Sequence, residues 1–367
     1  MRLRIKGMIF LLLTGAAISV FLAFTNVDVA AADRAPVEAR NQTEASGTSY
    51  STAGALVGKT RPGLSETPTQ VAIGLYVNDI VKISDAERTF TVDLFGRLRW
   101  KDSRLAPKGR SSATGTRQLL LEDIWHPWPT ILNRRESMRI FPDTVEVNSE
   151  GMVTYKQRLY GNLSTPLDLK DFPFDRHILK IEIVSLYQTD EVLFTVDEEI
   201  IGQTETPSIV DWTIGPGSAS VDSKYIPSLD RTVPRFIYQF EVRRRLAYYI
   251  WKIMVPLCLI ISISWSVFWI DPSQLGPQMG ISVTALLTLM VYLHRIGDLL
   301  PKVPYLTRMD EFILGSLVLV FLAFFEAIAT GTLAGRGKSA LAQRIDRWSR
   351  GVFPASFALL VAFVFLR

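Results

Sequence analysis

The sequence predicts an all-β, immunoglobulin-like sandwich followed by a bundle of four membrane-spanning helices. Short runs of alternating apolar residues fill positions 68 to 245, and four long apolar segments follow from position 246 onward. Composition agrees, because 48% of the 367 residues are hydrophobic and only 21% are charged, which favours a membrane protein. The net charge is only +4, and the basic residues form no single run, which argues against a nucleic-acid-binding protein.

The N-terminal segment predicts export across a membrane. Basic residues at positions 2, 4 and 6 precede an apolar stretch from Met8 to Phe24 and an alanine run that ends at Ala32. This order is typical of a secretory signal peptide over residues 1–32, with a retained membrane anchor as the alternative. Residues 33–67 are rich in Ala, Ser, Thr and Gly without apolar periodicity, so we expect a flexible linker there.

The alternating segments between residues 68 and 245 predict the strands of the sandwich. The clearest lie at Val71–Val77, Phe90–Leu94, Ile181–Ile183 and Phe236–Val242, and turn-forming residues separate them. The only cysteine, Cys258, lies in an apolar run, so neither an intrachain disulfide nor a cysteine-based metal site is possible. We expect no cofactor and no metal, and the absence of a nucleophile and base constellation argues against an enzyme with catalytic residues.

Four apolar segments predict the membrane helices at about residues 246–270, 276–297, 310–333 and 340–366. Each can cross a hydrocarbon core about 30 Å thick when its polar flanks are included. The connection between the third and fourth helices is strongly basic, with a single acid, Asp346. The positive-inside rule therefore places this loop in the cytoplasm of a plasma (inner) membrane, with the sandwich and the C-terminus on the periplasmic or extracellular side.

One face of the predicted second helix is patterned like the wall of a pore. The face repeats at steps of three or four residues and comprises Gly280, Thr284, Leu287, Val291, His294 and Asp298. If several copies surround an axis, Leu287 and Val291 form a hydrophobic constriction, and Thr284 can contact ions or water. A single chain cannot enclose such a pore, so the pattern implies an oligomer.

The segment TPLDLKDFPFDRHIL, residues 165–179, resembles the signature loop of the pentameric ligand-gated ion channels, the superfamily of acetylcholine and glycine receptors. Thr165 and Leu179 occupy the positions of the two cysteines, as is typical of the prokaryotic branch. The resemblance covers about residues 68–367. Further matching motifs follow in the family's order: Trp100-Lys101-Asp102, Ile124-Trp125, Pro256 with Ser264-Trp265, Leu300 to Tyr305, and Phe353-Pro354.

The resemblance implies a homopentamer around a central pore lined by the second helix, with agonist binding between neighbouring outer domains. It also implies that the loop at residues 165–179 couples ligand binding in the outer domain to opening of the pore. By that carry-over Asp175 would pair with Arg244, with Asp85 or Glu87 nearby. Phe172, Pro173 and Phe174 would contact the linker between the second and third helices, including Lys302 and Pro304.

The same resemblance suggests a ligand site between subunits. The positions that match it are Phe95, Arg97, Tyr155 and Arg158 on one side and Tyr187 and Tyr225 on the other. Strand alternation places Phe95, Arg97 and Arg99 on one face. Because arginine in this place binds an agonist's carboxylate in glycine and GABA receptors, we expect an anionic or carboxylate-bearing small molecule.

Ion selectivity is predicted from the charges along the second helix. No acid lies between Asp271 and Asp298, which favours conduction of anions such as chloride, although Asp298 at the outer mouth favours cations. Three alternatives stay open: a cation-selective channel, a channel opened by protons through His126, His177 or His294, and a periplasmic ligand sensor that does not conduct. The predicted partners are copies of the same chain, a small-molecule agonist or protons, permeant inorganic ions and the lipid bilayer.

Overall fold

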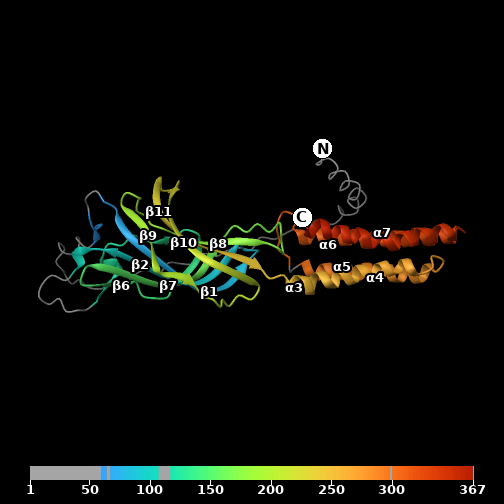
Figure 1. Cartoon of the computed structure of the whole chain (residues 1–367), viewed down its shortest axis with the longest axis horizontal. Helices are drawn as coiled ribbons and strands as arrows, with labels where there is room; N and C mark the ends of the chain where they lie inside the picture. Colours follow the sequence, from blue (N-terminus) through green and yellow to red (C-terminus); the bar gives the residue numbers. More distant parts are fainter. Residues whose placement is uncertain (1–58, 64–66, 107–115, 298–299, 367) are drawn as a thin grey trace, which may run out of the picture. The chain divides into compact units, whose positions relative to one another are not determined.

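The computed structural model describes residues 59–63, 67–106, 116–297 and 300–366, which form a β-domain and a helical bundle (Figure 1). The predicted signal peptide, most of the predicted linker and the predicted pore residue Asp298 lie outside these residues. The strands are β1 (Thr69–Ser84), β2 (Thr89–Lys101), β3 (Arg117–Leu120), β4 (Thr130–Ile131), β5 (Arg134–Arg139), β6 (Thr144–Val147), β7 (Met152–Ser164), β8 (Arg176–Val184), β9 (Val192–Gln203), β10 (Trp212–Ile226) and β11 (Arg231–Arg244).

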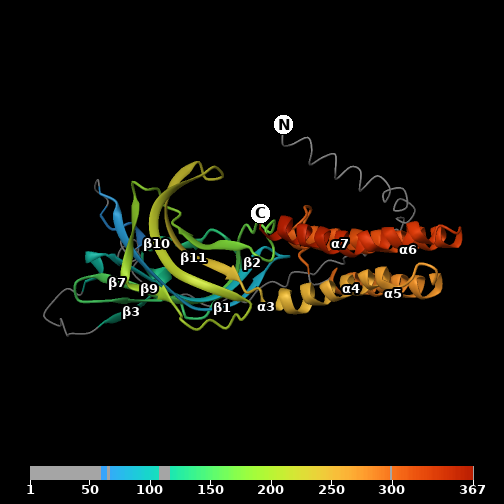
Figure 2. The same cartoon turned by 45° about the vertical axis from the view of Figure 1, so that its right-hand side comes forward.

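These strands form two sheets, which confirms the predicted sandwich. The larger sheet has the order β3-β6-β7-β2-β1-β9, with β5 also paired to β7, and the smaller has the order β10-β11-β8-β4. All neighbouring strands are antiparallel except β1 and β9, which are parallel. Figure 2 shows the long, curved β10 and β11 side by side.

The sandwich core forms because alternate side chains of each strand point inward. In β1 the side chains of Val71, Ile73, Leu75 and Val77 are all fully buried. The smaller sheet contributes a matching row from β8 and β11, in which Tyr238 pairs in register with Ile181. The alternation seen in the sequence therefore identifies the inner face of each of these strands.

The first membrane helix is continuous but changes its winding. It consists of α3 (Ala247–Tyr249), a π-helical turn (Ile250–Met254), α4 (Val255–Trp265) and a short 3₁₀ turn (Ser266–Trp269). Pro256 has no N–H to donate to the carbonyl of Lys252, four residues earlier. The hydroxyl of Tyr292 donates instead to the carbonyls of Lys252 at 3.0 Å and Ile253 at 2.8 Å. A neighbouring helix thus satisfies the backbone groups that proline frees inside the membrane.

The other membrane helices are α5 (Leu275–Gly297), α6 (Arg308–Gly335) and α7 (Ser339–Phe365). A capping box begins α6: the Thr307 hydroxyl accepts a hydrogen bond from the N–H of Asp310, whose carboxylate accepts from the N–H of Thr307. In the described chain, four helices are long and apolar enough to cross a membrane, which confirms the four predicted spans.

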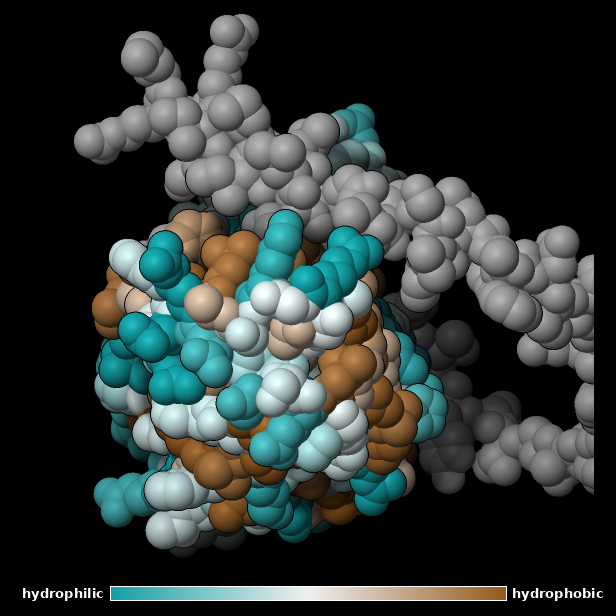
Figure 3. Space-filling model, turned by 90° about the vertical axis from the view of Figure 1, so that its right-hand side faces the viewer, coloured by the Kyte–Doolittle hydropathy of each residue, from teal (hydrophilic) through white to brown (hydrophobic). Residues whose placement is uncertain are grey.

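The side of the helical bundle is apolar, and the end with the helix-connecting loops carries both hydrophilic and hydrophobic residues (Figure 3). Leu259, Phe325 and Leu359 are 59%, 59% and 71% exposed, as expected of side chains that face lipid. Figure 3, which looks onto the end of the bundle that carries the loops α4–α5 and α6–α7, shows hydrophilic residues over this end and hydrophobic ones along its flanks. This pattern suits a bundle end at the membrane surface.

Candidate functional site

A buried ion cluster lies where the last strand meets the first membrane helix. Arg244, the last residue of β11, donates from Nε to Asp175 Oδ1 at 2.8 Å and from Nη2 to Asp175 Oδ2 at 2.9 Å. Its Nη2 also donates to Asp85 Oδ1 at 2.8 Å. The side chains of Arg244 and Asp175 are only 4% and 1% exposed. The structure therefore brings together the three charged residues that the resemblance placed in the coupling region.

Aromatic rings enclose the guanidinium of Arg244. Its Cζ lies 4.1 Å from the ring centroid of Trp212 and 4.8 Å from that of Phe172, within the range of cation–π attraction. Nη1 donates to the hydroxyl of Tyr249 at 3.3 Å. These rings exclude water, so the removal of either charge would leave its partner buried and unpaired.

His177 extends the cluster on the other side of Asp175. Its Nε2 lies 2.7 Å from Asp175 Oδ2, and its ring is nearly as buried as the carboxylate. Burial by itself raises the pKa of Asp175, but hydrogen bonds from His177 and Arg244 outweigh it and hold that pKa below its usual value. Asp175 is therefore ionised at neutral pH, with hydrogen-bond partners on both of its oxygens.

The loop before β8 also contacts the membrane helices directly. The N–H of Leu169 donates to the hydroxyl of Tyr305 at 3.0 Å, and the N–H of Arg308 donates to the carbonyl of Lys170 at 3.0 Å. Arg308 Nε further donates to Asp171 Oδ1 at 2.8 Å. The loop is thereby attached to the start of α6 by backbone and side-chain hydrogen bonds.

The aromatic tip of the loop packs on the ends of two membrane helices. Phe172 is fully buried and meets the ring of Tyr249 edge to face at 5.0 Å, while Phe174 packs 5.4 Å from Phe365 at the outer end of α7. Pro173 is buried. Of the linker from Lys302 to Tyr305, which the resemblance placed against the loop, Tyr305 forms a hydrogen bond to it, and Lys302 and Pro304 are exposed.

The described residues of the predicted pore stripe lie on one exposed face of α5. Gly280, Thr284 and His294 are exposed, and Leu287 and Val291 are 60% and 72% exposed. Leu287 and Val291 share this face with the polar side chains of Thr284 and His294, which is typical of a pore lining and differs from the purely apolar surface that faces lipid.

Two polar side chains of α5 are oriented by local hydrogen bonds. The Thr284 hydroxyl donates to the carbonyl of Gly280 at 2.7 Å, which leaves the lone pairs of its oxygen available on the exposed face. Gln278 is only 1% exposed, and its Nε2 donates to the carbonyl of Ile270 at 3.2 Å. Gln278 thus points into its own bundle and away from the exposed face.

Arg97, which is predicted to contact the ligand, already forms ion pairs within its own subunit. Its Nε donates to Asp197 Oδ2 and its Nη2 to Glu199 Oε2, both at 2.8 Å. Arg99 Nη2 donates to Asp197 Oδ1 at 2.7 Å. Asp197 is 1% exposed and Glu199 is 67% exposed, so the two carboxylates differ greatly in how easily a ligand could displace them.

Strand β7, which pairs with β2, places the predicted ligand-site residues Tyr155 and Arg158 on opposite faces of the sheet. Arg158 pairs in register with Phe95, forms an ion pair with Asp93 at 2.7 Å, and lies 5.5 Å from the Phe95 ring. Tyr155 pairs with Leu98 on the opposite face and is buried at 4% exposure. Its hydroxyl donates to Asp143 Oδ1, and burial followed by this bond raises the pKa of Tyr155 to about 12. The structure therefore does not bring Tyr155 to the face of Arg97.

Tyr187 and Tyr225, predicted on the other side of the ligand site, differ in how they are packed. Tyr187 accepts a hydrogen bond from Trp125 Nε1 at 2.9 Å and packs on the ring of Trp125. Tyr225 lies 54% exposed near the turn between β10 and β11 and donates to Asp230 at 2.7 Å. Tyr187 is fixed by the core, whereas Tyr225 is held only within its own hairpin.

Sequence reasoning missed three groups of the junction. Trp212 lies 32 positions before Arg244 and meets it only because β10 and β11 pair at these two residues. No sequence signal predicts that contact. Tyr249 and the N-terminus of α6 carried weak signals, an aromatic residue shortly after the basic run and the Thr307 capping box.

Comparison with known proteins gives two matching family models. The neurotransmitter-gated ion-channel ligand binding domain matches residues 56–246, and the neurotransmitter-gated ion-channel transmembrane region matches residues 253–341. A proton-gated ion channel from Gloeobacter violaceus is 29% identical over 308 residues, which cover 83% of this chain and 85% of that protein.

Vertebrate receptor subunits also match. The gamma-aminobutyric acid receptor subunit alpha-2 of Bos taurus is 27% identical over 286 residues, 76% of this chain and 63% of the subunit. The subunit beta-4 of Gallus gallus is 24% identical over 298 residues, 79% of this chain and 61% of the subunit. The matched region thus spans less than two thirds of these receptor subunits.

Proposed function

The chain belongs to the neurotransmitter-gated ion-channel family, the pentameric ligand-gated channels, and from this premise we propose that it forms a homopentamer whose pore is lined by α5 and opened by a ligand bound between outer domains. The family consists of channels, so the protein is not an enzyme. It spans the membrane with four helices, and its β-domain lies on the outer side.

The exposed stripe on α5 is the observation that carries the proposal of conduction. Leu287 and Val291 are 60% and 72% exposed, and a pore is the arrangement in which five copies of such a stripe can gate by dewetting. The test is single-channel recording from the purified full-length protein in planar bilayers, with pH and small metabolites scanned on the outer side. Unitary currents are expected, and ligand binding without any current would instead indicate a non-conducting sensor.

The junction cluster supports a coupling role for the loop before β8. Arg244 joins the end of β11 to Asp175 of the loop, and the loop is bonded to the N-terminus of α6. A movement of the outer domain that shifts the loop must therefore act on α6 and on the linker from α5. We assign Phe172, Pro173, Phe174, Asp175, Asp85 and Arg244 to this coupling path, with Lys302 and Pro304 as exposed members of the linker.

For the agonist, we propose a small molecule that carries a carboxylate and binds near Arg97. The side chain of Glu199 is 67% exposed, and its carboxylate lies 2.8 Å from Arg97 Nη2. An agonist carboxylate would take the place of Glu199, because the buried Asp197 cannot leave without exposing an unpaired charge. Phe95 and Arg158 flank this position, and Tyr187 and Tyr225 of the neighbouring subunit would close it.

Two variants test this site in opposite directions. Arg97→Ala should raise the agonist concentration for half-maximal current, because it removes the proposed partner of the carboxylate. Glu199→Gln should lower that concentration, because it removes the competing intramolecular carboxylate. Tyr155→Phe, on the opposite face of the strand, is the matched control and should leave the concentration response unchanged. An unaltered response in both Arg97 and Glu199 variants would refute this ligand site.

We propose that the pore conducts anions. No acid lies on α5 from Leu275 to Gly297, and the helix begins at the cytoplasmic mouth, where its unpaired N–H groups carry partial positive charge. Arg295 is exposed near the outer end. The test is the reversal potential in a gradient of potassium chloride across the membrane: it should follow the chloride potential, and a reversal potential that follows the potassium potential would identify a cation channel.

A second candidate is opening by protons. His177 is buried against Asp175 in the coupling loop, where a change of its charge would act directly on Arg244, and one relative is a proton-gated channel. A fast drop of external pH without any added ligand would activate such a channel. His177→Gln should then abolish the acid response, while His126→Gln and His294→Gln serve as controls at the other two histidines.

A further inference from the structure

A buried pair of acidic side chains joins α6 to α7 in the part of the bundle near the cytoplasmic loops. Asp346 of α7 is 2% exposed, and Glu326 of α6 is partly buried. The Ser349 hydroxyl, one helical turn after Asp346, donates to Glu326 Oε1 at 3.0 Å. Asp346 and Ser349 therefore share the face of α7 that meets α6 at Glu326.

The Thr330 hydroxyl beside this pair donates to the backbone carbonyls of Glu326 at 3.1 Å and Ala327 at 3.4 Å. Three of the four carboxyl oxygens of the pair accept no hydrogen bond from the described residues. They are Oε2 of Glu326 and both Oδ1 and Oδ2 of Asp346, and all three are buried. A fully ionised pair would place two negative charges side by side in a membrane protein with no donor for most of their oxygens. Such an arrangement is strongly unfavourable, because buried charges need a partner.

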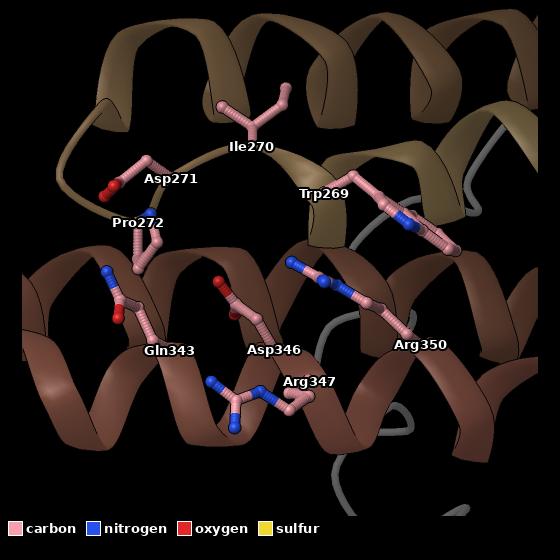
Figure 4. Close-up of a pocket in the computed structure, with 8 residues that line it drawn as sticks. All are labelled: Trp269, Ile270, Asp271, Pro272, Gln343, Asp346, Arg347 and Arg350. Carbon is pink, nitrogen blue, oxygen red and sulfur yellow. The ribbon is translucent and has the colours of Figure 1, made fainter.

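The surrounding charged groups do not supply that donor. Arg350 of α7 donates from Nε to the carbonyl of Phe268 at 2.9 Å, and its guanidinium lies 5.6 Å from the Trp269 ring. Figure 4 shows a cavity in which the Asp346 carboxyl is directed toward the α4–α5 loop with Asp271, which adds negative charge, and in which the Arg350 guanidinium extends to the side of Asp346. Arg347 lines the same cavity, of about 230 Å³.

The remaining neighbour of this region, α5, places the buried side chain of Gln278 against α6 at Gly331. Gln278 uses Nε2 for the carbonyl of Ile270, and its Oε1 is itself buried without a partner. A metal ion is not a suitable substitute, because the described residues contain no group of three or more His, Cys, Asp or Glu side chains placed to hold one.

We propose that Glu326 and Asp346 bind one shared proton, and that this proton holds the inner part of α7 against α6. One carboxyl group keeps its O–H and donates it to the carboxylate of the other, so the pair carries a single negative charge, as in other pairs of carboxyl groups that share a site. Because the cavity that borders Asp346 lies at the cytoplasmic loops, the proton exchanges with the cytoplasm.

The proposed site has a definite dependence on pH. The shared proton stabilises the contact between α6 and α7 at low and neutral pH, and its loss at higher pH leaves two facing negative charges. Stability should therefore fall as the pH rises. In Glu326→Gln the amide supplies a permanent donor to Asp346, so this dependence should disappear.

Infrared spectroscopy of the full-length protein in nanodiscs tests the shared proton directly. The wild type should show the C=O stretching band of a protonated carboxyl group at neutral pH, and the band should disappear as the pH is raised and in Glu326→Gln. Asp271→Asn, which alters a nearby exposed acid, is the matched control and should keep the band. Labelling glutamate and aspartate carboxyls with ¹³C in the wild type assigns the band even if a variant fails to fold.

Thermal unfolding over the same pH range gives a second readout. The melting temperature of the wild type and of Asp271→Asn should fall with rising pH, and that of Glu326→Gln should change less. A wild type without the protonated-carboxyl band at neutral pH would overturn the proposal, as would a band that survives in Glu326→Gln. A melting temperature that depends on added sodium, calcium or a chelator, and not on pH, would identify a bound cation instead.

Discussion

Replacing Asp175 by Asn removes the charge that faces Arg244 while it keeps the shape of the side chain. Both partners are almost completely buried, at 1% and 4% exposure, so the change leaves a guanidinium that has lost the partner of two of its hydrogen bonds. Breaking a buried ion pair costs about 3–5 kcal/mol. Asp85 still accepts from Arg244 at 2.8 Å, which places the expected loss at the lower end, about 3 kcal/mol.

The loss should appear both in stability and in gating. If the pair is altered between the closed and open states, a loss of about 3 kcal/mol changes the gating equilibrium by roughly a hundredfold, since each 1.4 kcal/mol is about a factor of ten. Agonist binding should be retained, because Asp175 lies at the junction and not at the Arg97 face. The assay is a concentration response of the current, or a response to external acid, combined with thermal unfolding of the same preparation.

Asp171→Asn is the matched control on the same loop. Asp171 pairs with Arg308 at 2.8 Å but is 61% exposed, so we expect a loss of only about 0–1 kcal/mol. If Asp175→Asn and Asp171→Asn have equal effects on current and stability, the buried pair is not a coupling element. Unaltered gating with reduced stability in Asp175→Asn would leave Asp175 only a structural role.

The lowered pKa of Asp175 also predicts that the stability of the protein falls at acidic pH. The pKa of Asp175 is lowered from its ordinary value of 3.8, so its stabilising contribution is complete above that value and is lost as the pH falls through the lower folded value. Thermal unfolding below about pH 4 should therefore show a decline of stability in the wild type that is smaller in Asp175→Asn.

Three further outcomes follow from other residues. Leu287→Ser should produce current without agonist, because it makes the proposed constriction easier to wet, and a silent baseline would argue against its place in the gate. Tyr155→Phe should lower the free energy of unfolding by about 1.5–3 kcal/mol, since it removes a hydrogen bond to the charged Asp143, with chemical denaturation as the measure. Burial, followed by Arg139, lowers the pKa of His126, so stability should decline as the pH falls below about 6.5. His126→Gln should remove that decline, and an identical pH profile in the variant would contradict the assignment.

Local patterns in the sequence determined the architecture. The alternation of Val71 to Val77 and of Phe236 to Val242 predicted strands whose inner faces are the buried ones, because side chains of a strand alternate between two faces wherever the strand lies. The four apolar segments predicted the membrane helices from length alone, and the basic loop between the last two gave their orientation. The motif resemblance supplied the pairing of Asp175 with Arg244.

The surroundings of those residues depend on contacts between distant parts of the chain. Trp212 packs against Arg244 because of the register between β10 and β11. Tyr292 donates hydrogen bonds to the backbone carbonyls that precede Pro256 because α5 packs beside the first membrane helix. Neither contact follows from periodicity, which reports the face of a residue but not its neighbour. Strand alternation predicted that Arg97 shares a face with Arg99, but the pairing of Arg97 with Asp197 depends on β9 lying beside β1 in the larger sheet.

Packing between helices likewise decided which polar residues face the exposed side of α5. The sequence identified the stripe that contains Leu287 and Val291, because helical spacing alone sets which residues share a face. It could not show that Gln278 turns into the bundle or that Glu326 and Asp346 meet there, since the rotation of each helix against its neighbours is fixed by side-chain packing over the whole bundle. The sequence thus determined the elements and their faces, and the tertiary structure decided which charges meet, because a charge is stabilised only by the partners that packing brings within a few ångströms.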